Sequence, residues 1–335
     1  MSEERIILAH GSGGRLSHEL VERVFLPHLG SEPLRQLNDA ATLALPPGRL
    51  AFTTDAFVVK PLFFRGGDIG RLAVCGTVND LATAGARPLY LSAAFVVEEG
   101  LPLTTLERVA AGMAAAAAEA GVVIVTGDTK VVERGSADGL FVTTAGVGTI
   151  SAGQDIAGQN ARPGDAVIIT GSLGDHGIAV ISAREGLSFS TEIASDVAPL
   201  NHLVAEMLAS GEVHALRDPT RGGLATTLNE IAGQSSVGVL LREDHLPIHA
   251  GVKAACELLG FDPLYVANEG KMVAFVAARD VEAVLRRLRQ LPYGAEAAII
   301  GEAVAEPRGR VLLRTTIGGT RVVDMLAGEL LPRIC

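Results

Sequence analysis

Apolar residues recur along the chain at two spacings, which predict alternating helices and strands. Apolar positions three and four residues apart predict helices at 16–26, 68–85, 103–120, 177–184, 200–209, 224–234, 249–259 and 280–291. Shorter apolar or alternating runs predict strands at 51–55, 89–97, 121–128, 139–150, 166–170, 237–241, 271–277, 298–301, 311–314 and 320–323. Helices and strands mix in both halves of the chain, so we expect an α+β fold made of two mixed α/β domains.

Turn residues interrupt this pattern between Gly158 and Asp165. The chain has 335 residues, which is long enough for two domains. We therefore predict an N-terminal domain at 1–157, a C-terminal domain at 158–324 and a mobile tail at 325–335. Pro332 favours an extended end for this tail, and Cys335 is its last residue.

Composition excludes several classes of partner. The formal net charge is −10, which disfavours unspecific binding to nucleic acid or to a membrane surface. With no Trp and only three Tyr, the chain offers few platforms for base stacking. We find neither a signal-peptide layout at the start nor an apolar run long enough to span a membrane. The three cysteines have no paired spacing, which favours a reducing cytoplasm, and we expect Cys75 and Cys256 to pack in cores.

Five aspartates, each beside small residues at the end of an apolar segment, are the main candidates for chemistry: Asp39, Asp55, Asp80, Asp128 and Asp218. A single Asp at such a place is commonly a cap. If several converge, their mutual repulsion is roughly 4 kcal/mol per pair at about 4 Å and an effective dielectric near 20, so cations are needed. Carboxylates without His or thiolate neighbours select Mg²⁺ or Mn²⁺, typically shared with phosphate.

Other candidates accompany these acids. The loop Gly11-Ser12-Gly13-Gly14, followed by Arg15, could offer main-chain N–H groups to phosphates, although it lacks the pattern of a P-loop. Lys130 and Lys271 are possible charge partners of a transferred phosphoryl group, or ordinary surface lysines. The α-carboxylate beside the Cys335 thiol should keep that thiol from ionising easily, and a frayed chain end is the simplest alternative for this tail.

Several motifs together resemble one known superfamily. They are the glycine loop, Asn38-Asp39-Ala40-Ala41, Thr53-Thr54-Asp55, the segment 78–86 around Asn79-Asp80, and Asp218-Pro219-Thr220-Arg221-Gly222-Gly223-Leu224. This set is similar to the aminoimidazole-ribonucleotide synthetase (PurM-like) superfamily. Within it, Gly127-Asp128-Thr129-Lys130, Asn268-Glu269-Gly270-Lys271 and the terminal Pro-Arg-Ile-Cys resemble the HypE family of [NiFe]-hydrogenase maturation proteins. The resemblance covers essentially the whole chain.

The resemblance implies a homodimer whose N-terminal domains share a β-barrel, with ATP and Mg²⁺ in the cleft between domains. It also implies an activity. The partner HypF places a carbamoyl group on Cys335, ATP-dependent dehydration converts this thiocarboxamide to a protein-bound thiocyanate, and the cyano group passes to iron on a HypC–HypD complex. Phosphorylation of the amide oxygen makes phosphate the leaving group, and a base removes the N–H protons.

The resemblance also implies roles for particular residues. Asp39, Asp55, Asp80 and Asp218 would hold the metal ions, and Gly11, Ser12, Gly13, Gly14, Asn79 and Asp128 would bind the nucleotide. Cys335, Glu269 and Lys130 would carry the dehydration, with Glu269 as the base; an ordinary surface Glu paired with Lys271 is the alternative. The eleven residues Met325 to Cys335 can span at most roughly 36–40 Å. We expect this arm to be mobile or outward in the unmodified protein, and inward when ATP and the carbamoyl group are both present.

Two other functions stay open at this point. The first is a superfamily kinase or synthetase acting on a free small molecule, such as selenophosphate synthetase. Such an enzyme has no need of a substrate-bearing tail, and the glycine loop here contains Ser12 where a selenophosphate synthetase would be expected to carry Cys or selenocysteine nearby. The second is a carrier that only shuttles a group made elsewhere, which would have no use for several metal ligands.

Overall fold

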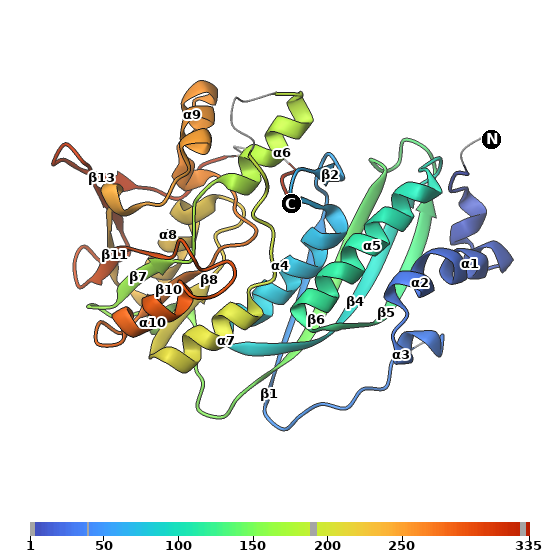
Figure 1. The fold of residues 1–335 in the computed structure, drawn as a ribbon, viewed down its shortest axis with the longest axis horizontal. Coiled ribbons are helices and arrows are strands. Elements are labelled where there is room, and N and C mark those ends of the chain that lie inside the picture. Colours follow the sequence, from blue (N-terminus) through green and yellow to red (C-terminus); the bar gives the residue numbers. More distant parts are fainter. Residues whose placement is uncertain (1–3, 39, 188–192, 329–332) are drawn as a thin grey trace.

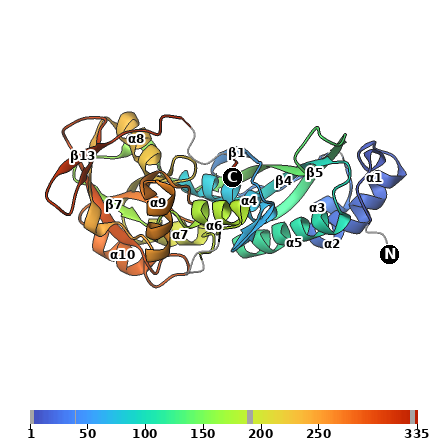
Figure 2. The same ribbon diagram turned by 90° about the horizontal axis from the view of Figure 1, so that it is seen from above.

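The structure is a computed structural model that describes residues 4–38, 40–187, 193–328 and 333–335. Two halves lie side by side along the long axis, each built on its own sheet, and the C-terminal end lies between them (Figures 1 and 2). The N-terminal half contains a four-stranded sheet in the order β1-β6-β4-β5. Its strands are β1 (Arg49–Phe57), β4 (Ala86–Glu98), β5 (Val123–Val132) and β6 (Leu140–Ile150). β4 and β5 are parallel, whereas the β1–β6 and β4–β6 pairs are antiparallel.

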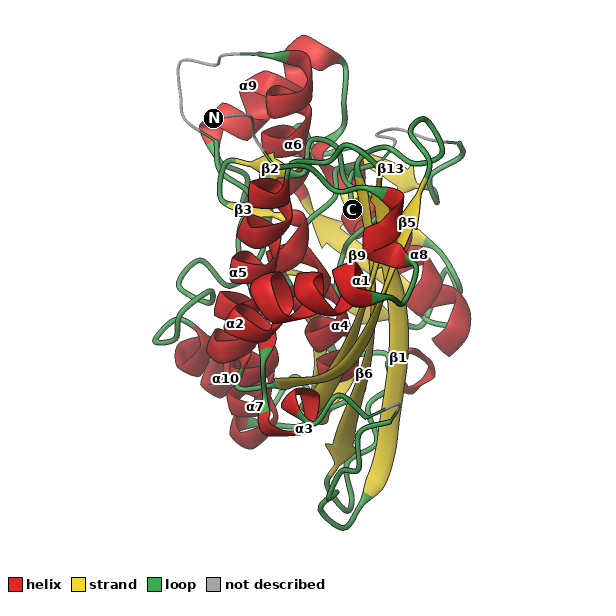
Figure 3. Cartoon of the chain, turned by 90° about the vertical axis from the view of Figure 1, so that its right-hand side faces the viewer, coloured by secondary structure: helices red, strands yellow, loops and turns green. Residues whose placement is uncertain are grey.

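Two long helices cover one face of this sheet, α4 (Ile69–Thr83) and α5 (Leu103–Ala120) (Figures 1 and 3). Asp68 caps α4 because its Oδ1 accepts hydrogen bonds from the N–H groups of Gly70 and Arg71, at 2.8 and 3.1 Å. α5 ends at Gly121, whose φ of 70° is the left-handed conformation that glycine adopts without strain.

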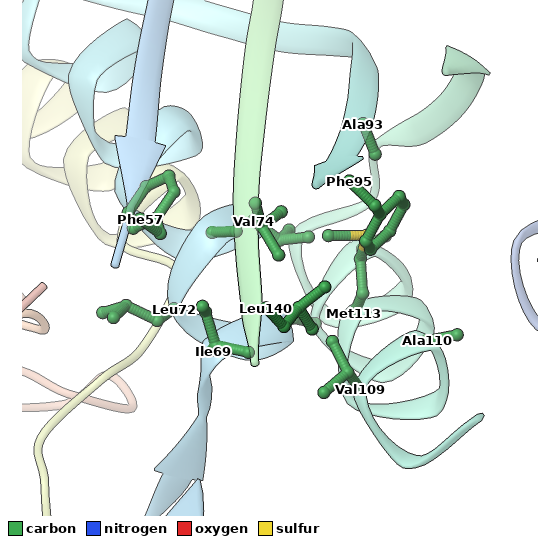
Figure 4. Close-up of a cluster of buried hydrophobic side chains, with 14 of the residues drawn as sticks. Phe57, Ile69, Leu72, Val74, Ala93, Phe95, Val109, Ala110, Met113 and Leu140 are labelled. Carbon is green, nitrogen blue, oxygen red and sulfur yellow. The ribbon is translucent and has the colours of Figure 1, made fainter. Parts of the chain in front are cut away.

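The core of the N-terminal half lies between these helices and the sheet. Figure 4 shows Phe57 of β1, Leu72 of α4, Phe95 of β4 and Met113 of α5 gathered there, each at most 3% exposed. Removing such side chains from water is the main driving force for folding, at roughly 1.5–3 kcal/mol for each large apolar residue. The helices that carry this core also carry Asp80, so the core fixes its position.

The other face of the sheet carries no helix of the described residues in this half. Burial alternates along β1, with Ala51 and Phe57 facing the helices and Leu50 and Phe52 facing away. Leu50 and Phe52 are 57% and 67% exposed, and Val96 of β4 and Val123 of β5 are also exposed. This face is therefore an apolar surface.

Short elements precede and follow β1. Near the N-terminus lie a 3₁₀ turn (Leu8–Gly11), α1 (Arg15–Leu20), a π-helical turn (Val21–Phe25), α2 (Leu26–Leu29) and α3 (Glu32–Arg35). The hairpin of β2 (Phe63–Phe64) and β3 (Gly67–Asp68) leads into α4. The first helix was predicted to end at residue 26, but Pro27 after it lies in the first turn of α2, where the missing N–H costs no hydrogen bond.

The C-terminal half contains a seven-stranded sheet in the order β13-β12-β9-β11-β7-β10-β8. Its strands are β7 (Ala166–Ile169), β8 (Val213–Arg217), β9 (Gly238–Arg242), β10 (Val273–Val276), β11 (Ala298–Val304), β12 (Val311–Arg314) and β13 (Thr320–Val323). Helices α6 (Asp175–Glu185), α7 (Asn201–Ser210), α8 (Gly223–Ser235), α9 (Ala250–Leu259) and α10 (Val281–Leu288) pack around it (Figure 1).

The predicted fold class is confirmed, because both halves mix helices and strands. Every predicted helix and strand is present, and α5, β12 and β13 have the predicted bounds. β8 was not predicted: its five residues show no alternation, and its pairing with β10 defines it. The predicted domain limits at 157/158 and 324/325 stay predictions. Within the described part of the chain, none of the helices combines the length and apolar character needed to cross a membrane.

Candidate active site

The end of the chain, residues 333–335, is docked between the two halves, with Arg333 in a turn at a φ of 53°. Val58 N–H donates to an α-carboxylate oxygen of Cys335 at 3.1 Å, and Lys60 N–H donates to the carbonyl of Arg333 at 3.3 Å. This spacing is that of an antiparallel strand pair. The Arg333 guanidinium extends the pairing, since it donates to the Val58 carbonyl at 3.0 Å and forms an ion pair with Asp138. Arg184 donates to the carbonyl of Arg333 at 2.6 Å.

The penultimate residue anchors this segment in the interior. The Ile334 side chain is 3% exposed and belongs to the core cluster of the N-terminal half. Its carbonyl lies 2.8 Å from Nε2 of His176, a fully buried residue in the first turn of α6. The expectation of an outward tail is therefore wrong for Arg333, Ile334 and Cys335, because main-chain pairing and apolar burial hold these residues inward. Residues 329–332 lie outside the described part of the chain.

Cys335 brings its thiol next to a group of carboxylates. Burial raises the pKa of this thiol above its usual range, and the nearby carboxylates of Glu269, Asp55 and Asp218 act in the same direction. The sequence predicted a thiol that ionises poorly, and the direction is confirmed. The main cause differs, since burial rather than the adjacent α-carboxylate dominates. Cys75 and Cys256 are buried in cores, as predicted.

Glu269 is the most perturbed of these carboxylates. It is 3% exposed, and burial together with the charges of Asp218, Asp196, Asp55 and Asp80 raises its pKa well above the usual range. Its Oε1 is buried without a hydrogen-bond partner. An unpaired buried carboxylate oxygen is costly and indicates a site that awaits a ligand or a proton. The alternative of a surface Glu paired with Lys271 is wrong, because Lys271 pairs with Asp196 at 3.1 Å instead.

The sequence around Glu269 explains how it is held. A Cβ at Gly270 would lie 1.8 Å from the carbonyl oxygen of Asp196, so only glycine fits there. Asn268, fully buried, accepts from Gly174 N–H at 2.8 Å and donates to the carbonyl of Pro219 at 3.0 Å. The motif Asn268-Glu269-Gly270-Lys271 therefore ties Glu269 to the loops that follow β7 and β8.

Three predicted metal ligands come together from different elements. Asp55 lies on β1, Asp80 in the last turn of α4, and Asp218 follows β8. Burial raises the pKa of each; for Asp218 it reaches about 7, with the charge of Asp80 as the second cause. Asp80 Oδ2 also accepts from the Thr53 hydroxyl at 2.9 Å. Asp80 and Asp218 line a cavity of about 580 Å³ with Arg217 and Arg221.

The described residues nevertheless contain no group of three or more His, Cys, Asp or Glu side chains placed to hold a metal ion. Asp39, the fourth predicted ligand, lies outside the described residues. Asp55, Asp80 and Asp218 are thus electrostatically coupled without forming a closed set of ligands. Such a set fits a cation that is shared with phosphate oxygens better than a site made by protein alone.

The predicted nucleotide ligands lie elsewhere on the N-terminal half. Gly11, Gly13, Asp128 and Lys130 line a cavity of about 310 Å³ between the N-terminal helices and β5. Ser12 donates its hydroxyl to the carbonyl of Ala9 at 2.9 Å, and Gly14 precedes the first residue of α1. The Lys130 ammonium pairs with Asp128 at 2.9 Å, and this pairing lowers the pKa of Asp128.

This cavity and the tail site are at opposite edges of one sheet. Asp55 pairs with Thr144, which pairs with Ala93, which in turn pairs with Gly127 beside Asp128. Three interstrand steps of about 4.8 Å separate the two edges by roughly 14 Å. One chain therefore does not bring Lys130 together with Glu269.

Asn79 has a different place from the one predicted for it. Its side chain is 2% exposed and forms hydrogen bonds only with the main chain of the other half. It donates to the carbonyls of Ala198 and Glu269 and accepts from Leu200 N–H, at 3.0, 3.4 and 2.8 Å. The amide thus links α4 to the C-terminal half; both of its N–H donors are used there, and burial keeps it from a nucleotide in solvent.

Sequence reasoning missed several residues of the site, namely His176, Arg184, Ser195, Asp196 and Arg221. Burial alone would raise the pKa of Asp196, but the charge of Lys271 and the hydrogen bonds from Glu269 N–H and Lys271 oppose it and lower this pKa. Four of these residues are not acids, and Asp196 does not follow a predicted helix or strand, so the signal used, an aspartate beside small residues at the end of an apolar segment, did not select them. Arg221 lies within the Asp-Pro-Thr-Arg-Gly-Gly motif and was the one that the sequence could have indicated.

Comparison with known proteins places this geometry in a family. Models of the AIR synthase related proteins match residues 37–150 (N-terminal domain) and 162–314 (C-terminal domain). Carbamoyl dehydratase HypE of Cupriavidus necator is 58% identical over 333 residues, covering 99% of this chain and 95% of that protein. Carbamoyl dehydratase HypE of Escherichia coli is 45% identical, covering 98% and 99%.

Solved structures agree with these relatives. A crystal structure of hydrogenase maturation protein HypE in complex with ATP has a TM-score of 0.95 at 51% identity, covering 98% of this chain and 99% of that one. A HypE–HypF complex has a TM-score of 0.81 at 49% identity, covering 93% and 100%. Thiamine monophosphate kinase of Aquifex aeolicus, at 18% identity and a TM-score of 0.61, shares the fold alone. By these identities over nearly its whole length, the chain belongs to the HypE family of carbamoyl dehydratases, among the AIR synthase related proteins.

Proposed function

We propose that this chain dehydrates a carbamoyl group carried on its own terminal thiol, Cys335, to a protein-bound thiocyanate in an ATP-dependent reaction. The observation that carries the proposal is the docked tail: the buried Cys335 thiol lies near enough to the Glu269 carboxylate for that charge to raise the thiol pKa, and Glu269 Oε1 is buried without a hydrogen-bond partner. The name of the relatives, carbamoyl dehydratase, supports the reaction class.

The reaction needs an activated oxygen and two proton transfers. Transfer of the γ-phosphoryl group of ATP to the carbamoyl oxygen releases one proton from nitrogen. The resulting O-phosphorylated carbamoyl group is still attached to the Cys335 sulfur through its carbon. Cleavage of the C–O bond then expels phosphate, and loss of the second N–H proton completes the C≡N bond. The sulfur–carbon bond stays intact throughout, so the product is Cys335 thiocyanate.

Glu269 is the proposed base for the nitrogen protons. A carboxylate with a raised pKa is a stronger base once it is ionised, and its Oε1 has no protein partner to give up. Positive charge near Asp55, Asp80 and Asp218 would favour this ionised form, because those carboxylates are among the groups that raise the pKa of Glu269.

ATP and Mg²⁺ are the proposed cosubstrate and metal. The described carboxylates fit a magnesium ion, since Asp55, Asp80 and Asp218 are oxygen donors whose burial raises their pKa values, and a bound cation would favour their charged forms. These residues, with Asp39, would hold the metal, and the glycine loop with Asp128 would bind the nucleotide. Mg²⁺ supplies neutralisation of charge on the phosphoryl group in such reactions.

A homodimer is part of the proposal, and the uncovered face of the four-stranded sheet supports it. Leu50, Phe52, Val96 and Val123 give this face an apolar surface that a second copy would remove from water. Closing two such sheets into one barrel brings the edge strands of each protomer beside those of its partner. Lys130 on the edge strand β5 would then act at the tail site of the other copy, as the electrostatic partner of the transferred phosphoryl group.

The proposed partners follow from the chemistry of the tail. HypF would supply the carbamoyl group to Cys335, and a HypC–HypD complex would accept the cyano group, in the cytoplasm. A HypE relative forms a complex with HypF, which supports the first of these partners. A pure carrier remains the alternative, as does a small-molecule kinase of the same fold. The electrostatic influence of Glu269 on the docked thiol disfavours both, because neither needs a base near a docked tail.

Intact-mass measurement of Cys335 tests the proposal. The protein is incubated with HypF and a carbamoyl donor, and then with Mg·ATP. We expect one carbamoyl addition followed by loss of one water, with phosphate released only when the carbamoyl group is present. The matched variant Glu269→Gln should accept the carbamoyl group and stop there. A wild-type protein that keeps the thiocarboxamide with ATP present would instead be a carrier.

A further inference from the structure

His176 holds the peptide bond that joins Cys335 to the chain. Its Nε2 lies 2.8 Å from the carbonyl oxygen of Ile334, which belongs to this peptide. On the other side, Val58 N–H donates to an α-carboxylate oxygen of Cys335 at 3.1 Å. The two bonds bracket the Cα of Cys335 and so fix the direction in which its side chain points.

The partners of the imidazole determine its tautomer. A carbonyl oxygen can only accept, so Nε2 carries the proton and donates to Ile334. In the neutral ring Nδ1 is then an acceptor, and it lies 2.8 Å from the Ser195 hydroxyl. The Ser195 oxygen accepts in turn from Val197 N–H at 3.1 Å, which leaves its own hydrogen for Nδ1. The chain of donors runs from Val197 through Ser195 and His176 to the tail.

The surroundings keep the ring neutral and fixed. His176 is 0% exposed, and burial lowers its pKa against the opposing charge of Asp196. The Phe64 ring contacts it edge-on, with ring centroids 5.4 Å apart at 90°. Ser195 is held by its own N–H, which donates to the carbonyl of Arg65 at 2.8 Å.

We propose that His176 is a positioning residue of the dehydration, which presents the Cys335 sulfur and its carbamoyl group to Glu269 by holding the Ile334 carbonyl, with Ser195 fixing the required tautomer. The role of His176 in dehydration rests on the proposed function, whereas its role in docking the tail does not. The other anchors, Arg184 and Lys60 N–H, hold the carbonyl of Arg333, two residues from the thiol. They secure the tail without orienting its last peptide.

The hydrogen bond from neutral His176 to the Ile334 carbonyl is also weak enough for a tail that has to be released to a partner protein. Its loss changes the ratio of docked to released tail by about tenfold, equivalent to about 1.4 kcal/mol. That is enough to bias the tail inward and small enough for a partner protein to reverse.

Alkylation of the unmodified full-length protein by iodoacetamide measures this docking, with peptide mass spectrometry reporting each cysteine. His176→Leu removes the donor and should speed alkylation of Cys335 by about tenfold. His176→Gln keeps an amide donor and should stay near the wild-type rate, and Ser195→Ala should fall between them. His245→Leu is the matched control, because His245 also contacts a main-chain carbonyl, that of Ile299, but in the seven-stranded sheet.

Buried Cys75 and Cys256 report unfolding within the same samples, since they should stay unlabelled in folded variants. If His176→Leu unfolds, the comparison of Ser195→Ala with His176→Gln decides. The proposal is overturned if Cys335 is alkylated at the same rate in wild type and His176→Leu, or at the same rate in Ser195→Ala and His176→Gln.

A second readout separates positioning from simple stability. Carbamoylated His176→Leu should convert to thiocyanate more slowly at saturating ATP, with an unchanged KM for ATP, and His176→Gln should restore the rate. If wild type makes no thiocyanate at all, the proposed function fails while faster alkylation of His176→Leu still supports the docking role. Normal turnover by His176→Leu would refute the positioning role even if alkylation is faster.

Discussion

Gly270 offers a sharp test of how the main chain places the proposed base, because it follows Glu269 directly. A Cβ added there would lie 1.8 Å from the carbonyl oxygen of Asp196, whereas ordinary contact begins at 3.4 Å. The main-chain segments at Gly270 and Asp196 would have to separate by the difference, 1.6 Å. Its φ is not in the left-handed region, so the effect of Gly270→Ala is steric alone.

Overpacking of this kind costs about 1–3 kcal/mol of stability, and more where the contact is main chain. Activity should fall further than stability, since a displacement of about 1 Å at a catalytic group can cost 10²-fold in rate. Thermal denaturation and the ATP-dependent mass loss at Cys335 measure the two effects. At a temperature where the variant is still fully folded, we expect the rate to drop about 100-fold.

Gly233→Ala is the matched control. Gly233 lies inside α8, is exposed, and has no heavy atom within 4 Å of an added Cβ. This substitution should leave activity unchanged and raise stability by about 0.5–1 kcal/mol, because alanine loses less entropy in a helix. The reasoning is refuted if Gly270→Ala melts and turns over like wild type, or if both substitutions have the same effect.

Three further predictions follow from the site. If Lys130 acts on the tail of the partner, mixing the Lys130→Ala and Glu269→Gln proteins and allowing subunits to exchange should restore about a quarter of the wild-type rate, because half of the dimers are then mixed and each mixed dimer has one intact site of two. No recovery would place both residues in one chain or exclude one of them. Asp80→Asn should keep the fold but weaken Mg·ATP binding by about 2–4 kcal/mol, as measured by calorimetric titration, and unchanged affinity would remove Asp80 from the site. Docking raises the pKa of Cys335, so the docked tail favours the thiol form; docking is complete below the pKa of the free thiol, about 8.5, and weakens as the pH rises above it. The rate of alkylation should therefore level off at a higher pH in wild type than in His176→Leu. Identical pH profiles for the two proteins would contradict this linkage.

The sequence predicted the parts of this protein whose signals are local. Periodicity located the helices and most strands, and α5 was predicted with its final bounds because Gly121 ends it. Acids at the ends of apolar segments indicated Asp55, Asp80 and Asp218, which the fold does bring together. Glu269 was identified through resemblance, and its burial could not be read from its neighbours.

What the sequence could not predict depends on contacts between distant segments. β8 exists because β10 pairs with it, and the tail lies inward because residues 58–60 offer main-chain partners. Asn79 looked like part of a nucleotide site because it precedes Asp80, yet helical geometry turns its side chain toward the other half of the protein. His176 carries no sequence signal at all, since its role arises from a carbonyl 158 residues away.

The three hydrogen bonds of Asn79 have a consequence for how the enzyme can work. They join α4, which carries Asp80, to the main chain at Ala198, Leu200 and Glu269. Because the amide is buried, opening the two halves would expose or abandon all three bonds at once, at a cost of several kcal/mol. The proposed base and the proposed metal ligands therefore behave as one rigid frame. Turnover in such a protein proceeds by transport of the covalently attached substrate into and out of a stationary catalyst, rather than by closure of the catalyst around it.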